Sequence, residues 1–387
     1  MDFSFTEEQH RFRRDVREFL EEESEKGALE VRSNYFIETS SPEFSRKLAS
    51  KGWLGLTWPK EYGGADRSYI DRTILMEELM RYQAPLMYHF FGERQIGPSL
   101  MHFGTEEQKS EFLAKIINAE ISFCLGMSEP GAGSDVAAVK TSAREEGDYY
   151  IINGQKTWTT HAHNADYVWL LAVTDPEGPK YRNLSEFIVD IRAPGVEVRP
   201  LYNMIGVHSF NEVYFDDVKV HKKYLVGKKN KGFYQMLAQV DYERAGIERL
   251  MQNYPLFENL KAHVRNSPLS SDSLVRDRLA QLEIEFQVGR LLVYHVAWVI
   301  DQGRIPNYEA AVSKTFCTLY EQRLGNMATE ILGEFGHVMP GFEGTPFKGD
   351  AAESYLWSPS YTIQGGTVEI LKTVIATRGL GLDFKER

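Results

Sequence analysis

Apolar residues recur three and four positions apart near the start of the chain, at Phe12, Val16 and Phe19. This spacing is typical of one face of an α-helix. Thr6 followed three residues later by Gln9 has the pattern of a capping box and marks where the helix should begin. Comparable signals predict helices in two later segments, 70–82 and 105–116.

The pattern changes near residue 119. From there, short runs rich in β-branched and aromatic residues are separated by Pro, Gly and Asp, which is typical of strands and turns. Asn153-Gly154 lies between two such runs and predicts the turn of a β-hairpin. Further strands are predicted at 167–175, 185–191, 196–201 and 211–220.

Helical spacing returns after residue 231. It predicts long helices at 233–251, 273–300 and 308–333, and a final helix from about Thr367 to Arg378. The fold class is therefore a multi-domain α+β protein. We expect an N-terminal helical domain at 1–118, a sandwich- or barrel-like middle β-domain at 119–226 and a C-terminal four-helix bundle at 227–387.

Composition and charge exclude several classes of function. The 387 residues carry a formal net charge of -11, which argues against a nucleic-acid surface. The two cysteines, Cys124 and Cys317, are expected to be free buried thiols. The charged N-terminal segment does not read as a signal peptide, and the apolar run at 291–300 is too short to cross a bilayer. We expect a cytoplasmic protein that binds neither nucleic acid nor membrane.

The segment GMSEPGAGSDVAA, Gly126 to Ala138, contains three glycines among its first eight residues. Glycine permits positive φ and close approach of the backbone to a ligand. Ser128, Ser134 and exposed N–H groups could bond a polar planar ligand or a phosphate. Taken alone, this composition fits an ordinary turn better than a site.

Two other segments carry comparable signals. In KTWTT, Lys156 to Thr160, the indole of Trp158 offers a flat apolar face beside two hydroxyls, although ordinary strand composition would look the same. Near the C-terminus, Gly365-Gly366-Thr367 opens a predicted helix, where backbone N–H groups could meet a polar cofactor edge. His161 and His163 are not accompanied by acids or cysteines at metal-binding spacing, so we expect a loop histidine pair and no metal site.

Together these segments resemble the acyl-CoA dehydrogenase family. The resemblance covers nearly the whole chain and includes FTEEQ, WPKEYGG, FGTEEQKSEFL, MSEPGAGSD, KTWTT, FNEVYFDDVKV and GGTVEILKTVIA. Members of this family are flavoproteins that desaturate acyl-CoA thioesters. The resemblance implies FAD as cofactor, an acyl-CoA substrate, an electron-transferring flavoprotein as acceptor, and a tetrameric assembly.

The resemblance also implies roles for individual residues. The cofactor-binding residues would be Met127, Ser128, Gly133, Ser134, Trp158, Thr159, Thr160, Gly333, Gly336, Gly366, Thr367 and Glu369. The substrate-binding residues would be Ser134, Asp241, Tyr242, Arg244 and Gly365.

The catalytic base is the main departure. Many members carry a glutamate immediately before the Gly-Thr of the C-terminal turn, where this chain has Gly365. A second branch of the family carries its base on a bundle helix, and the matching residue here is Glu243 in QVDYERAGIERL. Gly246, in the same predicted helix, would then leave room for an acyl chain.

The expected FAD half-site also departs from the family pattern. The segment EILGEFG keeps Gly333 and Gly336 but has Glu330 and Glu334 where the family has glutamine and glycine. Extra carboxylates would repel a diphosphate. This departure leaves open a homotetrameric enzyme and a non-catalytic or half-site subunit of a heterotetramer. A separate alternative is a dehydrogenase of a carrier-protein thioester.

Overall fold

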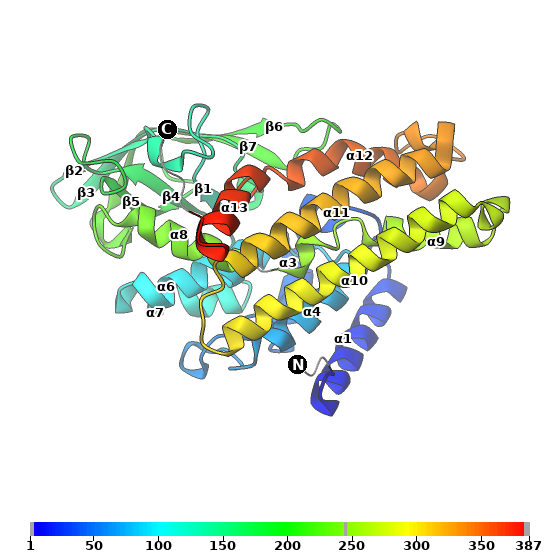
Figure 1. The fold of residues 1–387 in the computed structure, drawn as a ribbon. Helices are drawn as coiled ribbons and strands as arrows, with labels where there is room; N and C mark the ends of the chain where they lie inside the picture. The colour runs from blue at the N-terminus through cyan, green and yellow to red at the C-terminus, as the bar shows by residue number, and fades with distance from the viewer. Residues whose placement is uncertain (1–3, 244–245, 383–387) are drawn as a thin grey trace. The chain divides into compact units, whose positions relative to one another are not determined.

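The computed structural model describes residues 4–243 and 246–382, apart from the side chains of 240–243 (Figure 1). Its contacts group the chain into two compact units. The bundle unit contains 1–36, 67–84 and 244–387, and the sheet unit contains 37–66 and 85–243. The chain runs from a helical N-terminal segment through a β-sheet region to a helical C-terminal region, which confirms the predicted fold class. The domain boundaries at 118 and 226 stay predictions.

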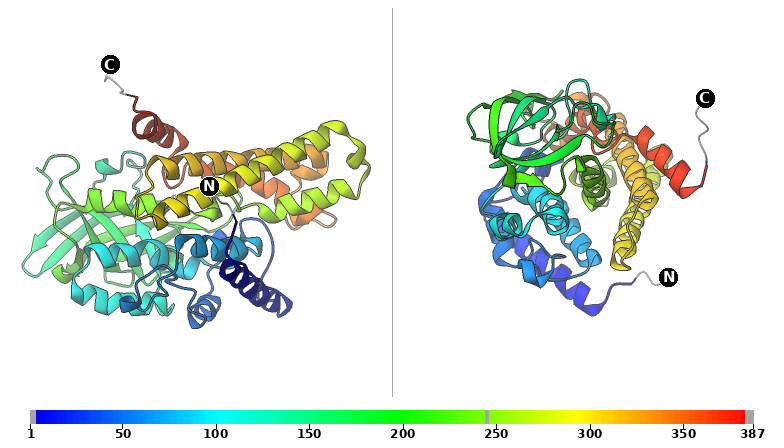
Figure 2. Two further views of the ribbon diagram at one scale, coloured as in Figure 1. Left: turned by 60° about the horizontal axis from the view of Figure 1, so that its bottom comes forward. Right: turned by 90° about the vertical axis from the view of Figure 1, so that its left-hand side faces the viewer.

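The bundle unit is built from helices. The first begins at Thr6, whose hydroxyl accepts a hydrogen bond from Gln9 N–H at 3.2 Å, so the predicted capping box is confirmed. Figures 1 and 2 show two long helices, α10 and α11, side by side. The helices of this unit are α1 (Glu7–Glu25), α4 (Tyr69–Arg81), α9 (Tyr254–Arg265), α10 (Ser273–Asp301), α11 (Tyr308–Leu332), α12 (Asp350–Tyr361) and α13 (Val368–Val374).

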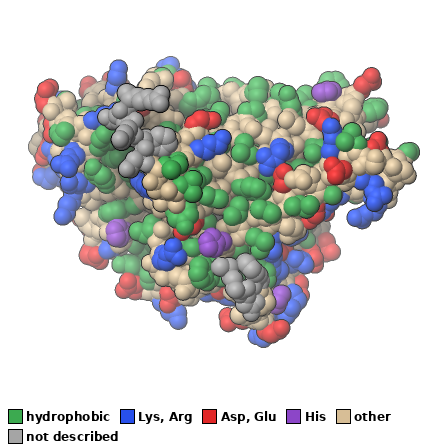
Figure 3. Space-filling model, viewed as in Figure 1, with side chains coloured by type: hydrophobic (Ala, Val, Ile, Leu, Met, Phe, Trp, Pro, Cys, Tyr) green, Lys and Arg blue, Asp and Glu red, His purple; other side chains and the backbone are tan. Residues whose placement is uncertain are grey.

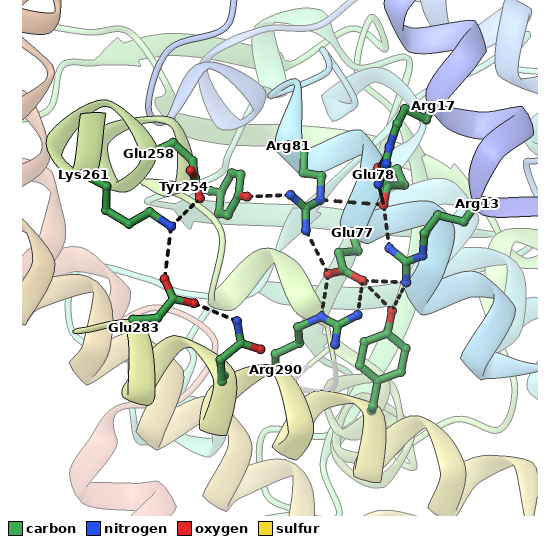
Figure 4. A network of polar contacts seen from close by, with 12 residues as sticks. Arg13, Arg17, Glu77, Glu78, Arg81, Tyr254, Glu258, Lys261, Glu283 and Arg290 are labelled. Atoms are coloured by element: carbon green, nitrogen blue, oxygen red, sulfur yellow. Dashed lines mark hydrogen bonds and ion pairs between the residues drawn. The ribbon is translucent and has the colours of Figure 1, made fainter. Parts of the chain in front are cut away.

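A network of charged side chains ties α1, α4 and α10 together inside the bundle unit (Figure 4). At its centre is Glu77, which accepts hydrogen bonds from Arg290 Nε at 2.6 Å and from the Tyr294 hydroxyl at 2.6 Å. Arg13 lies 2.9 Å from the same carboxylate. Burial alone would raise the pKa of Glu77, but these partners outweigh it and lower the pKa to about 2.

The sheet unit contains an eight-stranded sheet with the strand order β6-β7-β3-β2-β4-β5-β8, and β1 pairs in parallel with β4. Its core is formed by alternate inward-facing residues such as Ile152, Leu170, Phe187 and Val213. The strands are β1 (Phe123–Gly126), β2 (Ser142–Glu146), β3 (Tyr149–Lys156), β4 (Tyr167–Val173), β5 (Leu184–Asp190), β6 (Val196–Leu201), β7 (Phe210–His221) and β8 (Leu225–Val226).

The hairpin prediction at Asn153-Gly154 is wrong, because β3 runs straight through these residues. Gly154 instead occupies an irregularity in the pairing of β3 with β7, at φ 148°. A Cβ there would lie 2.6 Å from the Thr141 hydroxyl, so close packing explains the glycine. The turn between β2 and β3 lies earlier, at Gly147, which has φ 59°.

The helices of the sheet unit are mostly short. Thr105 and Gln108 form the second capping box, which begins α7. A π-helical segment, Gly92–Ile96, separates α5 from α6. The short α2 (Tyr35–Glu38) lies at the boundary of the two units. The helices of the sheet unit are α3 (Pro42–Ser50), α5 (Met87–Phe91), α6 (Gly97–Phe103), α7 (Glu106–Ile117) and α8 (Gly232–Glu243).

The predicted helix at 233–251 is too long. Helix α8 ends at Glu243, and Gly246 has an extended backbone with φ -96° and ψ 145°. The expectation that Gly246 leaves room for an acyl chain is also wrong. A Cβ at Gly246 would lie 2.0 Å from a carboxylate oxygen of Glu248, so this side chain already fills the space.

Two simpler expectations can be compared directly with the structure. Cys124 and Cys317 are both buried and free, as predicted. Across residues 4–243 and 246–382, the structure contains no helix that combines the length and apolar character needed to cross a membrane.

Candidate active site

The glycine-rich segment and the KTWTT segment lie side by side in the sheet unit. Thr157 N–H donates to the backbone carbonyl of Ser128 at 2.9 Å. The ammonium group of Lys156 donates to the carbonyl of Met127 at 3.1 Å. These bonds join residues about 29 positions apart, so the fold brings together two segments that the sequence singled out independently.

A buried ion pair fixes this arrangement. Lys156 Nζ lies 2.9 Å from Glu129 Oε1, and the two side chains are 0% and 8% exposed. Glu129 also accepts from the backbone N–H groups of Lys140 at 2.7 Å and Thr141 at 2.8 Å. Although burial opposes the charge, Lys156 and these donors lower the pKa of Glu129. Burial lowers the pKa of Lys156 to about 8, so both groups are charged near pH 7.

Sequence reasoning missed Glu129 and Lys156 as a pair. Each lies inside a motif that was recognised, but a charged residue is normally assigned to the surface. Nothing along β3 marks Lys156 as buried, because this strand also contains the polar residues Asn153 and Gln155. The acceptor that compensates its ammonium group, Glu129, lies 27 positions away in the chain.

Trp158 and Thr159 have the properties expected of a ligand-binding surface. Trp158 has a left-handed backbone at φ 58° and is 58% exposed. Thr159 is buried, its backbone is paired with Asn211 at 3.0 Å and 2.9 Å, and its hydroxyl is a buried polar atom without a hydrogen-bond partner among the described residues. An orphaned buried hydroxyl beside an exposed indole fits a polar-edged planar ligand such as a flavin.

The glycine-rich segment leaves open space beside this surface. A Cβ added at Gly131 or Gly133 would have no heavy atom within 4 Å. Ser128 is partly exposed and Ser134 is exposed. The segment therefore fits the approach of a bulky group to its backbone, as expected for the cofactor-binding residues implied by the resemblance.

The histidines after KTWTT form a stack. The rings of His163 and His208 are 3.9 Å apart, and both donate to Asn211 Oδ1. His161 is buried and donates from Nε2 to the carbonyl of Ile37 at 2.8 Å; burial lowers its pKa to about 4. In the described part of the chain, no group of three or more His, Cys, Asp or Glu side chains is arranged to hold a metal ion.

The C-terminal glycine turn lies in the bundle unit. Gly365 and Gly366 have φ values of 65° and 96°. The Lys314 ammonium group on α11, which is fully buried, donates to the carbonyl of Gly366 at 2.6 Å. Thr367 caps α13 by accepting a hydrogen bond from Ile370 N–H at 3.3 Å. Lys314 is a third residue that sequence reasoning missed, since nothing along the chain connects it to a turn 52 positions away.

The next residue proposed for the cofactor, Glu369, lies in the first turn of α13 and is exposed. Local hydrogen bonds, including one with Thr367, lower its pKa, so its carboxylate is charged at neutral pH.

The EILGEFG segment spans the end of α11, which ends at Leu332. Gly333 has φ 58°, and Gly336 packs against the end of the helix, where a Cβ would lie 2.6 Å from the carbonyl oxygen of Thr329. Glu330 forms an ion pair with Arg278. This pair compensates one of the two carboxylates that depart from the family pattern.

The proposed base and its neighbours are only partly described. The backbone of α8 ends at Glu243, but the side chains of Asp241, Tyr242 and Glu243 lie outside the described residues, as does Arg244. Their roles stay predictions.

Three family models match consecutive parts of the chain. The N-terminal, middle and C-terminal domains of acyl-CoA dehydrogenases match residues 6–120, 124–218 and 230–380. The chain belongs to the acyl-CoA dehydrogenase family of oxidoreductases.

Individual relatives agree with this assignment. The acyl-CoA dehydrogenase IpdE1 of Mycobacterium tuberculosis is 34% identical over 342 residues, which cover 88% of this chain and 87% of the relative. The solved steroid ACAD Tcur3481-Tcur3483 is 31% identical with a TM-score of 0.91, and the ChsE4-ChsE5 complex from Mycobacterium tuberculosis is 29% identical with a TM-score of 0.86. Each solved structure covers 100% of this chain and is covered fully by it.

Proposed function

We propose that this protein is an FAD-dependent acyl-CoA dehydrogenase that oxidises the bond between the α and β carbons of an acyl thioester and passes the electrons to an electron-transferring flavoprotein. The observation that carries the proposal is the Lys156–Glu129 ion pair, which joins the two cofactor segments and presents Trp158 beside the orphaned hydroxyl of Thr159. FAD, when bound, supplies the hydride acceptor.

The chain's own residues would supply orientation and proton transfer. Met127, Ser128 and Thr160 would contact the flavin, and Thr367 and Glu369 would contact the remainder of the cofactor. Ser134, Asp241, Tyr242 and Arg244 would hold the thioester arm. An α-proton of a thioester is a very weak acid, so a carboxylate base in an apolar pocket is needed, and Glu243 is the proposed base.

The test is flavin bleaching without oxygen. Wild-type protein is mixed with straight, branched, alicyclic and polycyclic acyl-CoA esters, and with one carrier-protein thioester. Glu243→Gln should retain FAD but lose flavin reduction, by about 100-fold or more. Glu248→Gln, which changes the next carboxylate along the chain, is the matched control and should still reduce its flavin. A Glu243→Gln protein that reduces flavin at the wild-type single-turnover rate would contradict the base assignment.

A second candidate is a half-site subunit of a hetero-oligomer. The solved neighbours named above are complexes of two different subunits, and α10 of this chain exposes an apolar stripe formed by Ile284, Val288, Leu291 and Trp298. Figure 3 shows hydrophobic side chains gathered on the face that carries α10. An exposed stripe of this kind is typical of a protein interface.

The two candidates differ in cofactor stoichiometry. The mass of the purified protein in solution and its FAD content per chain are measured together. A lone homo-oligomer that saturates at one FAD per chain would exclude the requirement for a sister subunit, whereas weak FAD binding that a co-expressed relative restores would favour the hetero-oligomer.

A further inference from the structure

Glu186 on β5 is a buried carboxylate at the start of helix α8. It is 1% exposed. Its Oε1 accepts a hydrogen bond from the indole N–H of Trp169 at 2.9 Å, and its Oε2 accepts one from the side-chain amide of Gln235 at 2.9 Å. Trp169 belongs to β4, next to β5 in the sheet, whereas Gln235 belongs to α8. The carboxylate therefore bridges the sheet and the helix through neutral donors on both sides.

Gln235 is itself held firmly. Its amide also donates to the carbonyl of Val226 at 3.2 Å, and its Oε1 accepts from the backbone N–H of Lys228 at 3.4 Å. A Cβ at Gly227 would lie 2.3 Å from this oxygen, so the amide fits closely against the chain. Because its oxygen already has a donor, the amide cannot turn over without losing contacts, and its N–H side stays directed at Glu186.

The first turn of α8 also packs directly on β5. A Cβ at Gly232 would lie 2.8 Å from the Cα of Ser185, so the helix begins in contact with the strand backbone. Asn230 N–H donates to the Ser185 hydroxyl at 2.8 Å, and the Thr174 hydroxyl donates to Asn230 Oδ1 at 2.6 Å. These contacts fix where α8 begins, and the bond from Gln235, about one turn further on, fixes its rotation.

We propose that Glu186, acting through Gln235, is a positioning residue that sets the axial position and rotation of α8 and thereby places the residues at its far end. This inference rests on the proposed function, in which Glu243 is the base. Gln235 precedes Glu243 by eight residues, or about 12 Å of helix. A helix transmits a shift at one end to the other, and a misplacement of about 1 Å can cost about 100-fold in rate.

Glu186→Gln tests the proposal. The substitution keeps the shape, but the new amide has one acceptor oxygen where the ionised carboxylate has two. Because burial raises the pKa of Glu186 to about 7, variant and wild type are compared above this pH. Its NH₂ group must then face a donor, either the Trp169 indole or the Gln235 amide. With the panel ester that bleaches the wild-type flavin fastest, we expect single-turnover flavin reduction to slow by about 10-fold to 100-fold, with FAD retained. In hydrogen exchange, the α8 amides should lose protection.

Two further variants separate positioning from stability. Trp169→Phe removes one donor to Glu186 but leaves the bond to Gln235; it should lower the unfolding midpoint and keep flavin reduction within about twofold of the wild type. The double variant Glu186→Gln with Gln235→Glu reverses the direction of the bond. Because a glutamate at 235 cannot donate to the carbonyl of Val226, as Gln235 does, the double variant should recover only part of the lost rate and of the α8 protection.

Unchanged exchange of the α8 amides in Glu186→Gln would overturn the proposal, and so would an equal loss of rate in Trp169→Phe. Failure of the proposed base looks different. In that case Glu243→Gln reduces flavin normally, while Glu186→Gln still lowers the hydrogen-exchange protection of the α8 amides. This result would support the role of Glu186 in positioning α8 and contradict the assignment of Glu243 as the base.

Discussion

Replacing Lys156 with methionine should destabilise the sheet unit and weaken FAD binding together. Methionine keeps most of the side-chain length but removes the ammonium group, which leaves Glu129 as an unpaired charge at 8% exposure. Breaking a buried ion pair in this way typically costs about 3–5 kcal/mol. Glu129 retains its two backbone donors, from Lys140 and Thr141. The lower end of the range, about 3 kcal/mol or roughly 150-fold in the folding equilibrium, is therefore expected.

The assay combines urea unfolding with FAD titration of the stripped protein. Lys180→Met is the matched control, because Lys180 pairs with Asp135 of the same glycine-rich segment at 2.8 Å, yet these two side chains are 48% and 55% exposed. An exposed ion pair contributes about 0–1 kcal/mol, so Lys180→Met should have nearly the same free energy of unfolding as the wild type. If Lys156→Met lies within about 1 kcal/mol of the wild type and binds FAD normally, the ion pair does not hold the two cofactor segments together.

Two further substitutions test the interior of each unit. Burial raises the pKa of Glu321 from 4.5 to about 8, against the donors Gln252 and Asn253. The folded state therefore binds a proton on Glu321 more tightly than the unfolded state does. The resulting contribution to the free energy of unfolding is fully present below pH 4.5 and is lost as the pH rises to about 8, by at most about 1.4 kcal/mol per pH unit. Glu321→Gln should flatten urea stability measured between these pH values, and parallel curves for variant and wild type would contradict this. Gly97→Ala gains about 1 kcal/mol of helix propensity, but its Cβ would lie 2.0 Å from the buried Trp58 ring. Overpacking costs about 1–3 kcal/mol, so we expect the variant to have a lower melting temperature than the wild type. An unchanged or higher melting temperature would refute this expectation.

Local signals explain which elements could be predicted. The capping boxes at Thr6 and Thr105 act within four residues, and both appear in the structure as expected. The Asn153-Gly154 prediction failed because a glycine in a strand can serve close packing as well as a turn, and the neighbour that decides between them, Thr141, lies on another segment. The end of α8 at Glu243 was missed because the apolar spacing continues beyond it.

The candidate site likewise contains residues that local signals could predict and residues that depend on distant partners. The composition of the glycine-rich and KTWTT segments is ordinary when each is taken alone, and they could be recognised because together they resemble the motifs of one family. Glu129, Lys156 and Lys314 could not, since their importance comes from partners distant in sequence: Lys156 reaches back 27 positions and Lys314 forward 52. Propensity and periodicity describe neighbours along the chain, whereas a buried charge is explained only by what surrounds it in space.

The Gly365-Gly366 turn gives a physical reason to look for the base on another element. A glutamate at 365 would have to adopt φ 65°, a left-handed conformation that costs a non-glycine residue about 1–2 kcal/mol. The buried ammonium group of Lys314 holds the next carbonyl, that of Gly366, at 2.6 Å, so the turn is anchored in this conformation. The backbone conformation at position 365 therefore favours glycine. A glutamate could not replace Gly365 without a change in the conformation of the turn. Glu243 as the base, as proposed above, would require no carboxylate at this turn.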